Sequence, residues 1–337
     1  MQISDSYVRL PMYIIDLIKE ANLFYSEEYE ANVRFRGQKQ IYVWDKFFIL
    51  VARVKQVAFV KGAVLETEPY MLEFGGDEKE FLTDAMEELS KQGIHWVESN
   101  VTARFQTYPR GASVVPCGNF ILDLQLTEEE LFSNIHSKHR NSIRRGEKAG
   151  LELRMGHSEL IDDYAKLAIE TYRRSNKHDE GAPYYRRLTQ GLENESLYFL
   201  IYKDGVAQAG AQFYFNKRIA YYLHGATIDH PETGAANYLM WRAILFFKEM
   251  GVRELSLVGY RYNPDKGSKL EGIQRFKERF GGVLEQSYMF KCVNNNFIYK
   301  LYKIVIQIMR GKPFMVYKDA IDEQKERYPE LNGEASV

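Results

Sequence analysis

Hydrophobic and polar residues follow two different periods along this chain of 337 residues. The apolar run over 41–64, with turn residues near Asp45-Lys46 and Lys61-Gly62, predicts two or three strands. Apolar residues at helical spacing then predict a helix over 78–92. Further short apolar runs predict strands over 94–99 and 120–126.

The second half of the chain repeats this order more clearly. Thr127 with Glu130, and Ser268 with Glu271, have the spacing of capping boxes at helix starts. The predicted helices cover 128–149, 158–174, 235–250 and 268–280, and the predicted strands cover 197–203, 206–215, 219–226, 252–259 and 283–291. We therefore expect a duplicated α/β unit with its boundary near 127–150.

Composition excludes several classes of protein. Forty-five basic and 46 acidic side chains nearly balance, and 45% of residues are hydrophobic, which argues against disorder and against a generally basic nucleic-acid coat. Two cysteines, Cys117 and Cys292, make no disulfide or metal framework and fit a reducing compartment. We find no run of about 20 apolar residues and no signal-peptide pattern, so we expect a cytoplasmic protein.

Three stretches together resemble the FemABX family of peptidoglycan-bridge aminoacyltransferases, a branch of the GNAT superfamily with two GNAT-like halves. They are FILDLQLTEEELFSNIHSKHRNSIRRGEKAGLEL (120–153), YYLHGAT (221–227) and QRFKERFGG (274–282). The resemblance covers about 40–290, and the size is that of the shorter FemX-type members. The family's aromatic-Asp pair is absent, because Leu255-Ser256 and Val258-Gly259 stand in its place.

The resemblance implies two tandem GNAT-like domains, with mixed, mostly antiparallel sheets flanked by helices. The expected parts are an N-terminal half (1–127), a C-terminal acyltransferase half (128–292) and an amphipathic helix with a tail (293–337). It also implies transfer of an aminoacyl group from a charged tRNA to an amine of a cell-wall precursor. It places Phe276 and Lys277 at the acceptor or donor groove.

Lys277 is the most informative single residue. It interrupts an expected buried stripe of Leu270, Ile273 and Phe280 on the 268–280 helix. Burying an unpaired ammonium is costly, so this lysine must find a partner, extend its head to water or have a chemical role. A fixed cation there would stabilise the oxyanion formed when an amine attacks an ester. The alternative is a lysine whose stem merely covers Phe280.

The loop before the 235–250 helix is the expected donor-binding loop, with Gly234, Ala235 and Ala236 at its end. CoA-dependent GNAT enzymes hold a pyrophosphate on backbone N–H groups at this place. Pro231 stands here at the usual Gln or Arg position and removes one N–H, which disfavours CoA. The alternative is a helix start built from small residues.

A basic stripe follows the 128–149 helix, because Arg140, Arg144 and Lys148 are spaced by four. These side chains would suit a UDP-linked precursor, a lipid pyrophosphate or a tRNA backbone. The alternative is a solvated face. The histidines of the same segment, His136 and His139, are expected at the surface and not as metal ligands, since no third ligand is visible.

Tyr222 and His224 are expected on one face of the 219–226 strand, with Tyr260 as a further substrate-binding residue. His224 is a candidate catalytic residue that takes a proton from the attacking amine, or alternatively a core histidine. The apolar stretch 296–311, with a polar stripe of Lys300, Lys303, Gln307 and Arg310, either lies on a membrane surface or packs on the protein.

These observations favour an acyltransferase without a bound cofactor, in which aminoacyl-tRNA or acyl-CoA is the co-substrate. The expected partners are a UDP-muropeptide or lipid-linked precursor and tRNA, with the protein in the cytoplasm or peripherally at the inner face of the membrane. One alternative is an acyl-CoA-dependent N-acyltransferase acting on an amino sugar of a surface polysaccharide. Another is a non-catalytic protein that binds the precursor.

Overall fold

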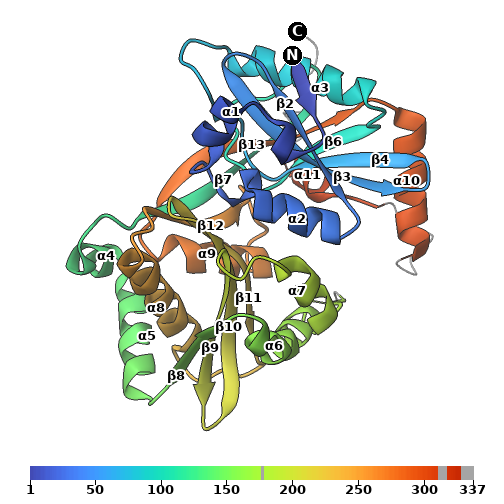
Figure 1. Ribbon diagram of the computed structural model, residues 1–337. Coiled ribbons are helices and arrows are strands. Elements are labelled where there is room, and N and C mark those ends of the chain that lie inside the picture. Colours follow the sequence, from blue (N-terminus) through green and yellow to red (C-terminus); the bar gives the residue numbers. More distant parts are fainter. Residues whose placement is uncertain (176–177, 310–316, 328–337) are drawn as a thin grey trace.

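The computed structural model describes residues 1–175, 178–309 and 317–327, and these residues build one continuous 13-stranded sheet (Figure 1). Its strands are β1 (Gln2–Ser4), β2 (Lys39–Trp44), β3 (Phe48–Val57), β4 (Val60–Leu65), β5 (Tyr70–Met71), β6 (Trp96–Ser99), β7 (Ser113–Asp123), β8 (Glu152–Gly156), β9 (Ser196–Lys203), β10 (Val206–Phe215), β11 (Ile219–Thr227), β12 (Glu254–Tyr260) and β13 (Val283–Val293). The strand order is β1-β2-β3-β4-β6-β13-β7-β12-β11-β10-β9-β8, and β5 pairs with β3.

Helices cover both faces of this sheet (Figure 1). They are α1 (Met12–Ile18), α2 (Glu27–Phe35), α3 (Glu78–Lys91), α4 (Glu128–Asn134), α5 (Ser137–Lys148), α6 (Ile161–Arg173), α7 (Ala182–Thr189), α8 (Ala235–Glu249), α9 (Lys269–Glu278), α10 (Asn296–Met309) and α11 (Ala320–Lys325). None of the helices in the described ranges is long and apolar enough to cross a bilayer.

The two halves of the sheet contain the same unit. In the first, the meander β2-β3-β4 leads through α3 to β6, which lies parallel to β4. In the second, the meander β9-β10-β11 leads through α8 to β12, which lies parallel to β11. The remaining strand pairs are antiparallel, so the predicted mixed and mostly antiparallel sheet is confirmed.

The strand that follows each unit in sequence is exchanged between the halves. After β6 the chain enters β7, which pairs with β12 of the second half. After β12 the chain passes through α9 and enters β13, which pairs with β6 of the first half. Since β7 and β13 also pair with each other from Ser113 to Ile121, the halves are joined through the centre of the sheet.

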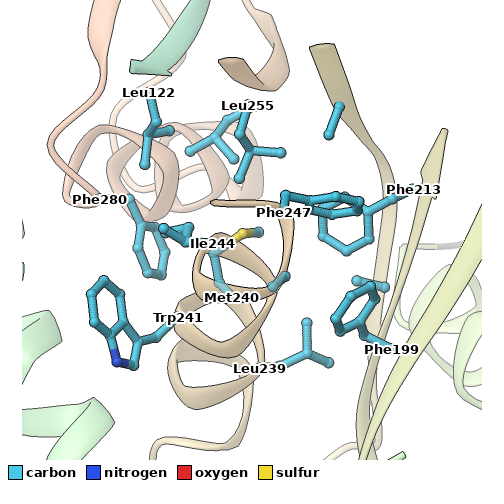
Figure 2. Close-up of a cluster of buried hydrophobic side chains, with 14 of the residues drawn as sticks. Leu122, Phe199, Phe213, Leu239, Met240, Trp241, Ile244, Phe247, Leu255 and Phe280 are labelled. Atoms are coloured by element: carbon cyan, nitrogen blue, oxygen red, sulfur yellow. The ribbon is translucent and has the colours of Figure 1, made fainter. Parts of the chain in front are cut away.

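Strand alternation divides the buried residues between the two faces of the second half. In β9, Phe199 and Ile201 pack toward α8, whereas Tyr198 and Leu200 pack toward α6 and α7. Figure 2 shows the α8 side, where that helix inserts Leu239, Met240, Trp241, Ile244 and Phe247 between the sheet and Phe280. This packing fixes the start of α8 and the position of α9.

A shared core joins the two halves on the face opposite α8. It contains Ile14 and Tyr29 from the N-terminal helices together with Tyr214, Tyr221 and Val258 from the second half. The first half has its own core under α3, which contains Phe81 and Leu82. Burial on both faces explains why the sheet is continuous through the middle of the molecule.

Three local predictions are wrong. Lys61-Gly62 lies inside β4, and the turn occurs at Ala58, which has a left-handed φ of 52°. The helix predicted over 128–149 divides into α4 and α5 at Ile135, which has an extended ψ of 132°. The capping box at Thr127 is confirmed. On α9, Ile273 is 41% exposed and Gln274 is buried instead, so the stripe around Lys277 is partly polar.

The C-terminal segment packs on the first half of the sheet. Lys291 of β13 is buried and lies 2.6 Å from Asp319 and 2.7 Å from Asp322, the residues at the start of α11. Lys303 of α10 also pairs with Asp322 at 2.8 Å. Of the predicted amphipathic stretch, Arg310 lies outside the described residues, as do parts of the predicted tail.

Candidate active site

A gap opens in the sheet where the parallel strands β11 and β12 separate. Their pairing begins at Ile219 with Glu254 and ends at Tyr221 with Ser256, although both strands continue. β11 has a bulge at Leu223, and β12 has an irregularity between Leu257 and Tyr260. A bulge bends its strand and redirects a side chain, so these irregularities shape both sides of the gap.

Lys277 of α9 extends to this gap, where its ammonium donates a hydrogen bond to the Val258 carbonyl. The side chain is only 9% exposed. Burial, with a smaller effect of the Arg261 charge, lowers the pKa of Lys277 to about 8. The ammonium is therefore still protonated at neutral pH, and it has three donors, of which Val258 takes one.

His224 lies on the opposite side of the gap from Lys277. Burial lowers the pKa of His224 to about 4; Asp179 acts to raise it and the Lys277 charge lowers it further. The imidazole is thus neutral at pH 7. Tyr222 does not share its face, because the bulge turns Leu223 and His224 toward a cavity while Tyr222 packs on Phe213 in the core. The expectation that Tyr222 and His224 lie on one face is wrong.

The cavity beside the gap measures about 410 Å³ and lies between the two halves. Leu223, His224 and Val258 line it from β11 and β12. Its other lining residues come from the first half, from β10 and from α7 with the loop before it, and the charged ones are Arg36, Arg53, Lys55, Glu66, Glu180 and Arg187. Four basic groups against two carboxylates give the cavity an excess of positive charge.

Arg53 is held in the wall of the cavity by an ion pair and a hydrogen bond. It lies on β3, is 8% exposed, and contacts Glu66 at 2.8 Å and Gln38 at 2.8 Å. Although burial acts to raise the pKa of Glu66, the Arg53 charge lowers it below its ordinary value. The Nε of Arg53 and the Nε of Arg36 are buried without a hydrogen-bond partner among the described residues.

The two other basic groups of the cavity come from neighbouring elements. Arg187 of α7 pairs with Glu180 at 2.8 Å and is half exposed, so its guanidinium is accessible. Lys55 follows Arg53 on the same face of β3, and desolvation together with the Arg53 charge lowers the pKa of Lys55. These basic groups were missed in the sequence, although Arg53 interrupts the apolar strand FILVARVKQV, as Lys277 interrupts its helix.

The predicted basic stripe on α5 lies away from this cavity. Arg140 donates hydrogen bonds to the carbonyls of Ser133 and Ile135, at 2.7 and 2.6 Å, and so closes the end of α4. Arg144 lies over the ring of Phe132, 5.3 Å from its centroid, and Lys148 is exposed. None of the three basic residues lines the cavity.

The predicted donor loop is a close contact between helices α8 and α5. Gly234 has a φ of 91°, and a Cβ there would overlap the Ser142 carbonyl of α5. Ala235 is buried in the core behind it, and Ala236 packs partly against the same core. The small residues are therefore needed for packing, whatever else this helix start does.

The remaining predicted residues pack near α9. Phe276 contacts the His139 ring at 5.3 Å, and Tyr260 contacts the ring of Phe120 at 5.4 Å. His139 is only 7% exposed, and its Nε2 lies 3.1 Å from the Phe276 carbonyl. The expectation that His139 lies at the surface is wrong, because α5 turns it toward α9. The described residues contain no cluster of three metal-ligating side chains.

Comparison with known proteins finds a family model that matches part of the chain. Residues 64–204 match the model of the FemAB family. These 141 residues are less than half of the chain. The matched segment begins in β4 and ends after β9, so it includes the exchanged strand β7 and the α4–α5 corner.

One curated relative of this chain is a lipid II:glycine glycyltransferase from Staphylococcus saprophyticus. The two are 26% identical over 138 residues, which is 40% of this chain. The match spans 33% of the length of that relative, about a third.

Solved structures share the fold. A crystal structure of FemX has a TM-score of 0.66 at 13% identity, covering 89% of this chain and 99% of FemX. The C-terminal domain of a putative lysylphosphatidylglycerol synthetase from Agrobacterium fabrum has a TM-score of 0.55 at 14% identity, covering 88% and 96%. Together with the repeated unit, the FemX fold confirms the predicted mixed α/β architecture of two tandem units.

Proposed function

We propose that this protein transfers an aminoacyl group from aminoacyl-tRNA to an amine of a peptidoglycan precursor. The match of residues 64–204 to the FemAB family model and the glycyltransferase activity named for its relative support this reaction. The observation that carries the proposal is the meeting of the basic cavity with the gap that holds Lys277. The cavity and the adjoining gap thus supply basic groups for an anion and a buried cation.

The acceptor occupies the basic cavity in this proposal. Peptidoglycan precursors carry a diphosphate, and guanidinium groups bind phosphate oxygens with paired, charge-assisted hydrogen bonds. Arg36 and Arg187 line the cavity from opposite halves, and Arg53 of β3 lines it as well. The free Nε atoms of Arg36 and Arg53 are donors that an anionic ligand would satisfy.

Lys277 stabilises the charge that develops during the transfer. The neutral acceptor amine attacks the ester carbonyl carbon, forming a C–N bond and a tetrahedral oxyanion beside the ammonium. The C–O bond then breaks, and the ribose hydroxyl of the tRNA leaves with a proton. A preorganised donor at such an oxyanion typically contributes about 10²–10³ in kcat. The hydrogen bond from Lys277 to the Val258 carbonyl holds the ammonium in place before the reaction.

His224 does not act as the general base in this proposal. A pKa of about 4 makes the imidazole a weak base, because its protonated form would be buried and near the Lys277 charge. We propose that neutral His224 accepts a hydrogen bond from the attacking amine and orients it. The amine then loses its proton to water or to the leaving hydroxyl.

The start of α8 favours a tRNA donor over CoA. Gly234 is packed against α5, and Pro231 lacks the N–H that a pyrophosphate would use. The exposed groups of the α5 stripe, Arg144 and Lys148, are then available for a tRNA backbone, whereas Arg140 is occupied by α4. Because charged tRNA is cytoplasmic, we place the reaction in that compartment.

We further propose that α10 rests on a lipid surface at the inner face of the membrane. Its exposed apolar side chains fall on one face at helical spacing and are Phe297, Leu301, Ile304, Val305 and Ile308. On the opposite face, Tyr299 and Tyr302 contact the ring of Trp96 at 5.3 and 4.4 Å. Packing and membrane contact therefore use different faces of one helix.

The decisive experiment offers the purified protein a UDP-muropeptide or a lipid-linked precursor, with either aminoacyl-tRNA or acetyl-CoA. Mass spectrometry should find an aminoacylated precursor only with charged tRNA. Turnover of acetyl-CoA without use of tRNA would instead support the N-acyltransferase alternative. Full turnover by Lys277→Ala would contradict the role of Lys277, and binding of the precursor without any turnover would support the non-catalytic alternative.

A further inference from the structure

A buried amide without partners lies beside the candidate active site. Gln212 is in the middle of β10 and is fully buried, at 0% exposure. Neither its Oε1 nor its Nε2 has a hydrogen-bond partner among the described residues. Leaving a buried donor or acceptor unpaired destabilises the folded state. A strand position of this kind is ordinarily apolar, so the amide calls for a local explanation.

The strand register places His224 directly opposite this amide. Gln212 pairs with His224 on β11 and with Tyr198 on β9. Side chains of directly paired residues project from the same face, with Cβ atoms about 4.5–5.5 Å apart. The bulge at Leu223 sets this relationship, because without the extra residue His224 would pair one position away and face α8.

The His224 imidazole is equally without a hydrogen bond in the part of the chain that the structure describes. Its neighbours are the ring of Tyr185, 6.4 Å away, and the charged groups of Asp179 and Lys277. Asp179 is already engaged, because it accepts a hydrogen bond from the Tyr185 hydroxyl at 2.7 Å. An unpaired imidazole therefore lies beside an unpaired carboxamide, and each offers the groups that the other lacks.

We propose that Gln212 is a positioning residue for His224. Its carboxamide, held in a single orientation, bonds one ring nitrogen through one bridging water and thereby selects a single tautomer of the neutral imidazole. The other ring nitrogen is then presented to the cavity with a defined role. A neutral imidazole has one donor and one acceptor nitrogen, so fixing one side fixes the other. The part played by His224 in catalysis rests on the function proposed above, but the hydrogen bond does not.

The direct test is nitrogen-15 NMR of the His224 imidazole in the wild-type protein and in Gln212→Met, which is similar in length and lacks polar hydrogens. The wild type should show one tautomer. Gln212→Met should shift toward a mixture, because losing one hydrogen bond changes the tautomer ratio about fivefold. Ser256→Ala is the matched control, since Ser256 Oγ is also buried and unpartnered but lies on β12.

Two outcomes would overturn the proposal. One is a mixed tautomer of His224 in the wild type, which is decisive even if Gln212→Met does not fold. The other is an unchanged His224 spectrum in a folded Gln212→Met protein. With aminoacyl-tRNA and precursor, Gln212→Met should lower kcat about fivefold and leave KM for the precursor unchanged. Absence of activity in the wild type would refute the proposed function and leave the NMR result standing.

Discussion

The Lys277 ammonium bonds the Val258 carbonyl at the point where β11 and β12 have separated. In a regular sheet, that carbonyl would be bonded by a neighbouring strand. Because the strands have separated, the carbonyl instead accepts a hydrogen bond from a side chain of α9. The irregularity of the sheet and the buried position of the cation therefore depend on each other. This relationship places a buried positive charge beside Val258, which lines the basic cavity.

Replacing Lys277 by Met should lower kcat about 10²–10³-fold, with little effect on KM for the precursor, because the cation acts on the transition state. Lys166→Met is a suitable control, since Lys166 is exposed and pairs only with Asp163 of its own helix. Steady-state kinetics of both variants would check this. An equal loss in both variants would show that the effect is general to lysine removal.

Lys277 should also make stability depend on pH. Its pKa is 10.5 when unperturbed and about 8 in the folded protein, so between these values the unfolded chain binds more protons. Stability therefore rises as the pH increases from about 8 to about 10.5, relative to Lys277→Met. The shift corresponds to roughly 3 kcal/mol at most. Urea titrations of both proteins across this pH range measure it; parallel curves would contradict the lowered pKa.

Arg187→Gln should weaken precursor binding and raise KM about tenfold, with a small effect on kcat, because the guanidinium contacts the ground-state ligand and the transition state alike. Arg186→Gln is its matched control on the same helix, since Arg186 pairs with Asp162 and does not line the cavity. Calorimetry with a UDP-muropeptide distinguishes the two. Equal affinities of the two variants for the UDP-muropeptide would show that its phosphates bind elsewhere.

The triple variant Phe297→Ser, Ile304→Ser, Ile308→Ser should bind vesicles that contain anionic phospholipid at least tenfold more weakly than the wild type. Phe74→Ser is the control, because Phe74 is the most exposed of the large apolar residues, at 91%, and lies outside α10. Co-sedimentation measures the binding. A wild type that stays in the supernatant would exclude the lipid contact.

Gly234→Ala should lower the free energy of unfolding by several kcal/mol, because its Cβ would overlap the Ser142 carbonyl and its φ is positive. Gly251→Ala, with a φ of 76° and no atom within 4 Å of the added Cβ, should cost only about 1 kcal/mol. Thermal melts separate the two. Similar losses of stability in the two variants would show that backbone strain alone explains the destabilisation by Gly234→Ala.

Secondary structure was largely readable from the sequence, because it depends on neighbouring residues. The periodic apolar positions of α3, α8 and α9 and the apolar runs of β9 and β10 predicted these elements within a few residues. The capping box at Thr127 was visible for the same reason. The division between α4 and α5 was not, since Arg140 fixes it through contacts with carbonyls of another helix.

The sequence by itself determined the α/β class, the order of elements and the unusual position of Lys277, since each is expressed in the spacing of residues along one segment. Tertiary structure alone decided the exchange of β7 and β13, the separation of β11 from β12 and the gathering of Arg36, Arg53 and Arg187 around one cavity. These features depend on which segments far apart in the sequence pair with each other. The local pattern of apolar and polar residues does not specify that pairing.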